Sequence, residues 1–230
     1  MRRQLSALRP SADLLQPIIQ VHTSQSAWLG TFNFASQSSG AKVVESLTSP
    51  TYVPPLHPIA AWIKQLLGQK LPVPHPPSIA LEPVNEGCWP ISGPAGHLGI
   101  QLSSMVRITN VTIGHTPPDI IADIRSAPRS VSIWGLFNVT GSALDTRDRD
   151  SKLASMSPSL QAHLLPLLAI VPVHLGRFTY DVHSLHHVQT FDIVQVEHAL
   201  RFRHIVIEVE NNWGFESSTC LCEVRVHGEI

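Results

Sequence analysis

Three cysteines are the residues whose type and spacing most directly suggest chemistry. Cys220 and Cys222 lie two apart in an alternating segment, so their side chains leave one strand face together and cannot easily pair with each other. A bridge from Cys88 to either of them would close a long loop, which is worth roughly 4 to 5 kcal/mol. An odd count leaves at least one thiol unpaired. Three buried thiols in a reducing compartment are the alternative.

The histidines suggest metal binding as a second kind of chemistry. The chain has 13 of them, and the densest group is His183, His186 and His187. A zinc site needs three or four ligands fixed by secondary structure. This group lies in an expected hairpin loop with no nearby cysteine or evident fourth ligand. The pattern therefore favours ordinary loop histidines over a metal site.

A nucleophilic triad could be drawn from His115, Asp119 and Ser126. However, no nucleophile-elbow glycine pattern surrounds Ser126, so a histidine near a turn is the favoured interpretation. We expect that the protein is not an enzyme.

The tryptophans allow one more hypothesis, a sugar-stacking surface. Most of them are expected in the core or in turns, because tryptophan is usually largely buried. A lumenal glycan-binding or protein-binding β-sandwich is therefore kept as the second functional hypothesis. The tryptophans are Trp28, Trp62, Trp89, Trp134 and Trp213.

Composition limits the elements that can position these residues. The 230 residues fit one domain with appendages, and the formal net charge of -1, with no basic run, argues against nucleic acid as a partner. Charged residues make up only 14%, which favours strands and loops over exposed helices. The longest apolar stretch, 164–175, is interrupted by prolines and is too short to span a bilayer.

Helical spacing occurs in two places. Within residues 1–25 it predicts a short N-terminal helix, interrupted by Pro17, and no coiled coil is present. Between prolines in the segment 52–77 it predicts another short helix that ends at Gly68. The apolar residues at helical spacing in this second segment are Ile59, Trp62, Ile63, Leu66 and Leu67.

From residue 79 onward the apolar period is two, which predicts strands. Residues 106–113 are expected to form two strands with a break at Asn110, and 201–210 is the clearest strand. In this strand alternate residues predict one buried and one wet face. The alternation fails within 140–174, where a charged run predicts a long inserted loop. The fold class predicted is all-β, an antiparallel β-sandwich.

Several short motifs follow one another along the chain. They are residues 33–41, Gly87-Cys88-Trp89, Ser126-Ala127-Pro128-Arg129, Gly135-Leu136-Phe137, residues 175–181 and Asn212-Trp213-Gly214. Taken in order, these motifs resemble those of SUN domains, the lumenal modules of nuclear-envelope bridging proteins. The likeness covers about residues 32–230, preceded by a helical or linker segment 1–31.

The resemblance implies a jelly-roll-like sandwich that binds the C-terminal tail of a KASH-type outer-nuclear-membrane protein in the perinuclear space. Such tails add a strand to the sheet and place their carboxylate in a pocket. It also implies a lid at 52–76, beginning at Tyr52, and an insertion at 140–174. The role implied is a bridge from nucleus to cytoskeleton, in nuclear positioning or spindle pole body anchoring. The full-length protein would be a homotrimer with an upstream inner-nuclear-membrane anchor.

The carboxylate pocket of the family matches this chain in part. His115 and Ser126 match the pocket histidine and serine, whereas Ser218 and Cys222 stand where the family has tyrosines. Two aromatic hydroxyl donors are thereby lost, and a buried carboxylate needs replacements for them. We expect either a different tail or weaker binding.

The resemblance also implies a disulfide and a cation site. Cys88 and Cys220 match the family's intramolecular pair, which would leave Cys222 as the unpaired thiol. The loop 82–87 would bind a monovalent cation, K⁺ or Na⁺, through the backbone of Glu82, Val84 and Gly87. No other cofactor is expected. Thr48 replaces a cysteine that bonds covalently to the partner in some members, so no intermolecular disulfide is expected.

Overall fold

The computed structural model describes residues 32–55, 66–67, 73–82, 87–116, 123–138, 146–167, 169–193 and 200–230, and the predicted N-terminal helix lies outside them. The strands are β1 (Lys42–Val43), β2 (Trp89–Ser92), β3 (Gly96–Gly114), β4 (Pro128–Asn138), β5 (Ile170–Thr179), β6 (Val188–Asp192), β7 (Phe202–Asn212), β8 (Ser218–Leu221) and β9 (Glu223–Glu229). The helices are α3 (Thr146–Ala154) and α4 (Pro158–Leu164), with 3-10 helices η1 (Gln37–Ser39), η2 (Glu45–Leu47), η3 (Pro77–Leu81) and η4 (Ile124–Ser126).

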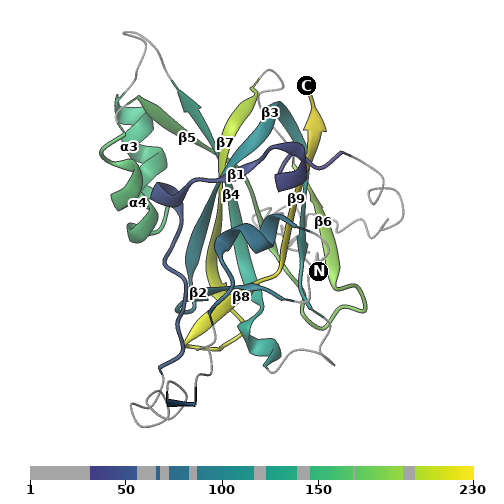
Figure 1. Cartoon of the computed structure of the whole chain (residues 1–230). Helices are drawn as coiled ribbons and strands as arrows, with labels where there is room; N and C mark the ends of the chain where they lie inside the picture. Colours follow the sequence, from purple (N-terminus) through teal and green to yellow (C-terminus); the bar gives the residue numbers. More distant parts are fainter. Residues whose placement is uncertain are drawn as a thin grey trace, which may run out of the picture.

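One long strand, β3, connects the two parts of the sandwich (Figure 1). Its first half pairs with β1 and β7, within the order β1-β3-β7-β4-β5, and its second half lies between β6 and β9. A separate pair, β2 and β8, completes the architecture, and all pairs are antiparallel. Apolar side chains from these strands share one core. The prediction of an antiparallel β-sandwich is confirmed.

The predicted break at Asn110 is a bulge within β3 and does not end the strand. The register against β9 shifts between Ile108 and Asn110. An extra residue at this point reverses the alternation. Val106 and Ile108 before it, and Val111 and Ile113 after it, can therefore all enter the same core.

The prediction of a loop at 140–174 is wrong for its described part, which contains α3, α4 and the start of β5. Ser157 caps α4, its hydroxyl accepting from the Leu160 N–H at 3.4 Å, and Pro158 follows at a position that favours helix starts. The apolar residues recur at helical spacing and are buried: Leu153, Met156, Leu160 and Leu164. The charged run 145–150 obscured this spacing in the sequence.

These helices lie beside β5 and cover a second face of the sheet (Figure 1). Their apolar residues form a separate cluster with Trp134, Leu136 and Val206. The wet face predicted for 201–210 is therefore wrong in its middle, where Val206 and Glu208 are buried, whereas His204 and Glu210 on that face are half-buried. The sequence of a strand does not show whether helices from elsewhere in the chain pack on its outer face.

Polar groups join the insertion to this sheet. The Glu208 carboxylate accepts the Trp134 indole N–H at 2.6 Å and the backbone N–H of Ser157 at 2.8 Å. The His97 ring lies 3.0 Å from the Leu47 carbonyl and 3.3 Å from the Ser159 hydroxyl. Buried polar groups are tolerated when they are hydrogen-bonded in this way. The insertion is thus an integral part of the domain.

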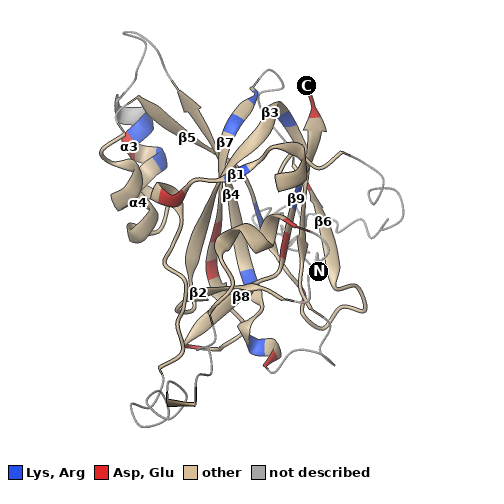
Figure 2. Ribbon diagram, in the orientation of Figure 1, with Lys and Arg blue, Asp and Glu red and all other residues tan. Residues whose placement is uncertain are grey.

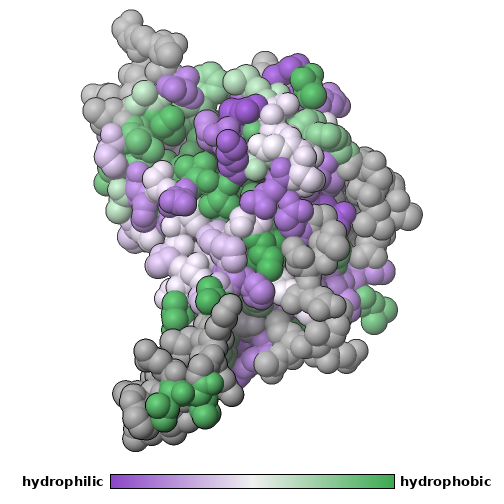
Figure 3. Space-filling view, in the orientation of Figure 1, coloured by the Kyte–Doolittle hydropathy of each residue, from purple (hydrophilic) through white to green (hydrophobic). Residues whose placement is uncertain are grey.

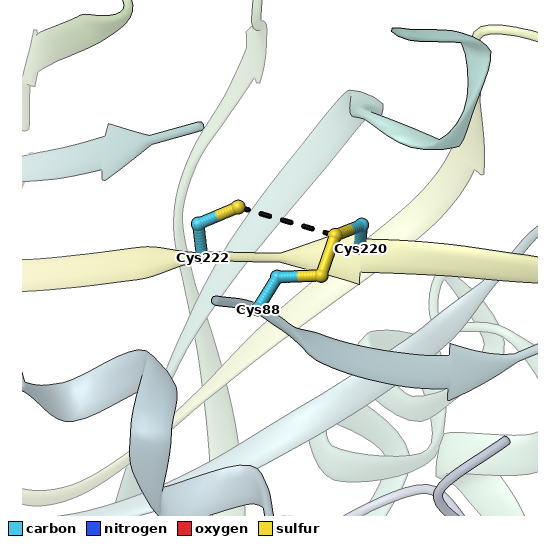
Figure 4. Close-up of side chains that lie close together, drawn as sticks. All are labelled: Cys88, Cys220 and Cys222. Carbon is cyan, nitrogen blue, oxygen red and sulfur yellow. Dashed lines mark hydrogen bonds between the residues drawn. A yellow bond between two sulfur atoms is a disulfide. The ribbon is translucent and has the colours of Figure 1, made fainter. Parts of the chain in front are cut away.

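A disulfide between Cys88 and Cys220 connects the chain just before β2 to β8, as the resemblance implied (Figure 4). The two Cα atoms are 5.4 Å apart, within the ordinary range for a bridge. Cys222 is a free, buried thiol.

Acidic and basic residues are sparse along the described chain and mixed in sign (Figure 2). Polar and apolar residues are interspersed on the face that the space-filling view shows (Figure 3). Ion pairs join Arg107 to Glu229 and Arg177 to Glu210. Among the described residues, no helix combines the length and apolar character that a membrane crossing requires.

Truncating the insertion's core should destabilise the whole domain. Leu160 is 0% exposed, so Leu160→Ala should lower the free energy of unfolding by about 2–5 kcal/mol in urea denaturation followed by circular dichroism. Leu165→Ala is the matched control, because Leu165 is 53% exposed and its loss should cost within about 0.5 kcal/mol. A loss for Leu160→Ala as small as that expected for Leu165→Ala would contradict a contribution of the insertion to the stability of the fold.

The disulfide should contribute substantially to stability. With a sequence separation of 132 residues, Cys88→Ser should cost roughly 4–5 kcal/mol in the chain-entropy model, seen as a lower Tm without reductant. Cys88 is a better residue to replace than Cys220, because in a variant without Cys220 the free Cys222 could pair with Cys88. Cys222→Ser keeps the bridge and serves as control. A Tm for Cys88→Ser equal to that of wild type would contradict a stabilising bridge.

Candidate functional site

His115 directly follows β3 and is the best-defined member of the predicted pocket. Its backbone N–H donates to the His187 carbonyl at 2.9 Å, which fixes it at the strand end. The side chain is buried, with its ring centroid 6.3 Å from that of Tyr180. Its Nδ1 lies 3.0 Å from the Thr116 carbonyl, while its buried Nε2 has no hydrogen-bond partner among the described residues.

These contacts define the protonation state of His115. A carbonyl only accepts, so Nδ1 carries a proton, and in the neutral ring Nε2 is then an acceptor. Burial lowers the pKa of His115 below its ordinary value of 6.5, against the opposing effect of the Thr116 carbonyl. His187 lowers this pKa further. The free protein therefore holds a neutral His115 whose Nε2 can donate to an anion only after it takes up a proton.

Cys222 lies close to this position. Its thiol is 3.3 Å from the hydroxyl of Thr116, which directly follows His115 in the chain. The same thiol is 4.0 Å from the Cys220 sulfur. Burial raises the pKa of Cys222, which keeps it a neutral thiol. The structure thus brings two of the four predicted pocket residues, His115 and Cys222, into one neighbourhood.

The two serines of the predicted pocket are buried and less available. The Ser126 hydroxyl donates to the Asp123 carbonyl at 2.7 Å, so its proton is already used. Ser218 begins β8, opposite Ser92 of β2, and its carbonyl accepts from the Asn212 side chain at 3.1 Å. The 3-10 helix η4, which contains Ser126, contacts β8, which begins at Ser218, so the two serines lie on neighbouring elements. No hydrogen bond between described residues joins either serine to His115.

The structure describes residues 52–55, 66–67 and 73–76 of the predicted lid. The Tyr52 N–H donates to the Pro90 carbonyl at 2.7 Å, which ties the start of the segment to β2. Leu66 has helical backbone conformation, and both Leu66 and Leu67 are exposed. Ile59, Trp62 and Ile63 lie outside the described residues.

The cation loop is also described in part. Glu82 ends η3 with extended backbone, and its N–H donates to the Ile79 carbonyl at 3.1 Å. At Gly87 a Cβ would lie 2.9 Å from the His75 ring, so this position requires glycine or a shift of that ring. Val84 lies outside the described residues. The monovalent cation stays a prediction.

Tyr180 was missed as a member of the site, although it lies in a motif used for the resemblance. Its hydroxyl donates to the His187 carbonyl at 2.8 Å, the same carbonyl that binds the His115 backbone. Burial raises the pKa of Tyr180, so it remains a neutral donor. Trp213 reinforces the corner by donating to the Tyr180 carbonyl at 3.2 Å. Only the fold brings these distant segments together.

The tryptophans do not form a sugar-stacking surface in the described part of the chain. Trp89 and Trp134 are buried, and Trp213 is half-buried. The Arg129 guanidinium lies over the Trp213 ring, 4.8 Å from the centroid of that ring. Trp28 and Trp62 lie outside the described residues.

Solved structures match this chain only at low similarity. The family 32 carbohydrate-binding module from Streptococcus pneumoniae EndoD has a TM-score of 0.48 and 9% identity, covering 86% of this chain and 100% of that one. This level of likeness has no bearing on function.

Sequence comparison is far more specific. SUN domain-containing protein 5 of Homo sapiens is 30% identical over 201 residues, which cover 86% of this chain and 44% of that protein. SUN domain-containing protein 2 of Mus musculus is 28% identical, covering 87% and 23%. The chain thus spans less than half the length of these curated relatives. The family model of the Sad1/UNC-like C-terminal domain matches residues 76–147 and 166–230, and the chain belongs to this family of SUN domains.

Proposed function

We propose that this SUN domain captures the C-terminal tail of a KASH-type protein in the perinuclear space and has no enzymatic role. The observation that carries the proposal is the buried, unpartnered Nε2 of His115, at the position that matches the pocket histidine of the family. A buried polar atom without a partner is costly unless a ligand supplies one. The carboxylate at a peptide C-terminus is such a ligand.

Two features of the surrounding residues support a modified pocket. Cys222 and Ser218 replace the family's tyrosines, but Tyr180 reaches the same corner of the fold from another strand end. The Thr116 hydroxyl, beside Cys222, can also turn towards an anion. Because the Tyr180 hydroxyl already donates its proton to the His187 carbonyl, we infer that the Thr116 hydroxyl, together with His115, replaces part of the lost donor set.

The cellular role that follows is a bridge across the nuclear envelope. The domain would hold an outer-membrane partner by its tail, while an anchor upstream would fix it to the inner nuclear membrane. A homotrimer is expected in the full-length context, and nuclear positioning or spindle pole body anchoring would be the task.

Tail capture should depend on the free carboxylate through His115. In fluorescence anisotropy with a labelled KASH-type C-terminal peptide, amidation of the peptide should weaken binding by about 1.5–3 kcal/mol, or roughly 10- to 150-fold. In His115→Ala the free-acid peptide should bind more weakly and amidation should matter little, because the two changes remove one interaction.

His204→Ala is the matched control, since His204 lies on β7 and pairs with the other half of β3. It should retain the full amidation effect. An amidation effect of the same size in wild type and His115→Ala would show that His115 does not contact the carboxylate. Absence of binding by either peptide would contradict tail capture by this chain.

The same contact should make binding pH-dependent. His115 is neutral in the free domain, and its pKa, lowered below 6.5, should rise when a carboxylate binds at Nε2. Binding then takes up a proton, so affinity should increase as pH falls from about 8 to about 6, by at most about tenfold per pH unit. The amidated peptide and His115→Ala should show no such slope. A flat profile for wild type with the acid peptide would contradict proton-coupled capture.

A further inference from the structure

All three cysteines of the chain converge at one buried point. The sulfur atoms of Cys88, Cys220 and Cys222 lie within 4.8 Å of one another. Cys220 and Cys222 project from the same face of the final strand segment, and Cys88 reaches them from the start of β2 (Figure 4). In the part of the chain that the structure describes, no other group of histidine, cysteine or acidic residues has this geometry.

The arrangement of the sulfurs is a compact triangle. With an ordinary S–S bond of about 2.05 Å, a third sulfur in line with the bridge and 4.0 Å from Cys220 would lie about 6 Å from Cys88. All separations are within 4.8 Å, so Cys222 lies beside the bridge and not on its axis. Thiol–disulfide exchange needs an in-line approach, and this geometry does not provide it.

The triangle suits a tetrahedral thiolate site instead. Zn–S bonds of about 2.3 Å place the sulfur ligands of one ion about 3.8 Å apart. Cys222 and Cys220 already lie 4.0 Å apart, and loss of the bridge would let Cys88 move from bonding distance to a similar separation. Only a small side-chain movement separates the bridged state from three ligands around one ion.

We propose that, once the Cys88–Cys220 bridge is reduced, the three cysteines form a binding site for a thiophilic cation such as Zn²⁺. A dithiol reductant supplies two electrons and two protons, the S–S bond breaks, and the reductant becomes a disulfide. The two new thiols and the Cys222 thiol release three protons when the ion binds. The fourth position of the ion remains open, with the Thr116 hydroxyl 3.3 Å from the Cys222 sulfur. This inference is independent of tail binding.

The site would give the domain two alternative cross-links between the same segments. Under oxidising conditions the disulfide joins the start of β2 to β8, and under reducing conditions the metal ion would join them. Cys222 has no role in the disulfide. A variant that lacks Cys222 and loses metal binding while it keeps the disulfide therefore identifies the metal site.

The test uses Cd²⁺ as a spectroscopic probe of the whole chain, reduced with a phosphine that contributes no thiol. Reduced wild type should bind one Cd²⁺ per chain with a thiolate-to-metal charge-transfer band, and Zn²⁺ should displace it and raise the Tm of the reduced domain. Cys222→Ser should bind at least roughly tenfold more weakly, since even outer-shell changes cost 10- to 100-fold. Oxidised wild type, with one free thiol, is the matched control and should not bind.

Failure of reduced wild type to bind Cd²⁺ would overturn the proposal, as would equal binding by Cys222→Ser or by the oxidised protein. If reduction unfolds the domain, the proposal requires Zn²⁺ to restore the far-ultraviolet circular dichroism of wild type but not of Cys222→Ser. Without that recovery the cysteines do not form a folded metal site.

Discussion

The pairing of one strand with both layers is the constraint on which the rest of this domain depends. Because β3 pairs with β7 in its first half and with β6 and β9 in its second, the two layers cannot move apart without breaking its ladder. The bulge before Asn110 keeps its apolar side chains directed into one core despite the change of partners. His115 follows the last residue of this strand, so the best-connected element of the fold positions the candidate pocket.

A second core gives the domain an unusual distribution of polar groups. The helices α3 and α4 bury Trp134 and Val206 on the face that a simple sandwich would leave in water. A carboxylate, Glu208, is buried with them and accepts hydrogen bonds from a sheet side chain and from the backbone at the start of the insertion. Because that face is covered by the chain itself, it is closed to a partner, whereas the candidate pocket lies at a strand end.

Local patterns predicted the parts of the fold that depend on local rules. Strand alternation identified β7, and the family likeness identified the Cys88–Cys220 pair. The insertion was predicted as a loop because its apolar residues are separated by polar ones and follow a charged run, although Leu153, Met156, Leu160 and Leu164 have helical spacing. The predicted wet face and the omission of Tyr180 have one cause. Each depends on contacts between segments far apart in sequence, which neither periodicity nor spacing encodes.

The sulfur bridge also changes how the chain would carry mechanical load. It closes a covalent ring that contains every residue from Cys88 to Cys220, including β3, α3, α4 and His115, whereas Cys222 and β9 lie outside it. Tension applied upstream of Cys88 and downstream of Cys220 passes directly between the two sulfurs and is not transmitted along the backbone within the ring. Within the ring, β3 and β6 would be shielded from such a pull, whereas β9, which pairs with the end of β3, lies outside the ring and would bear it.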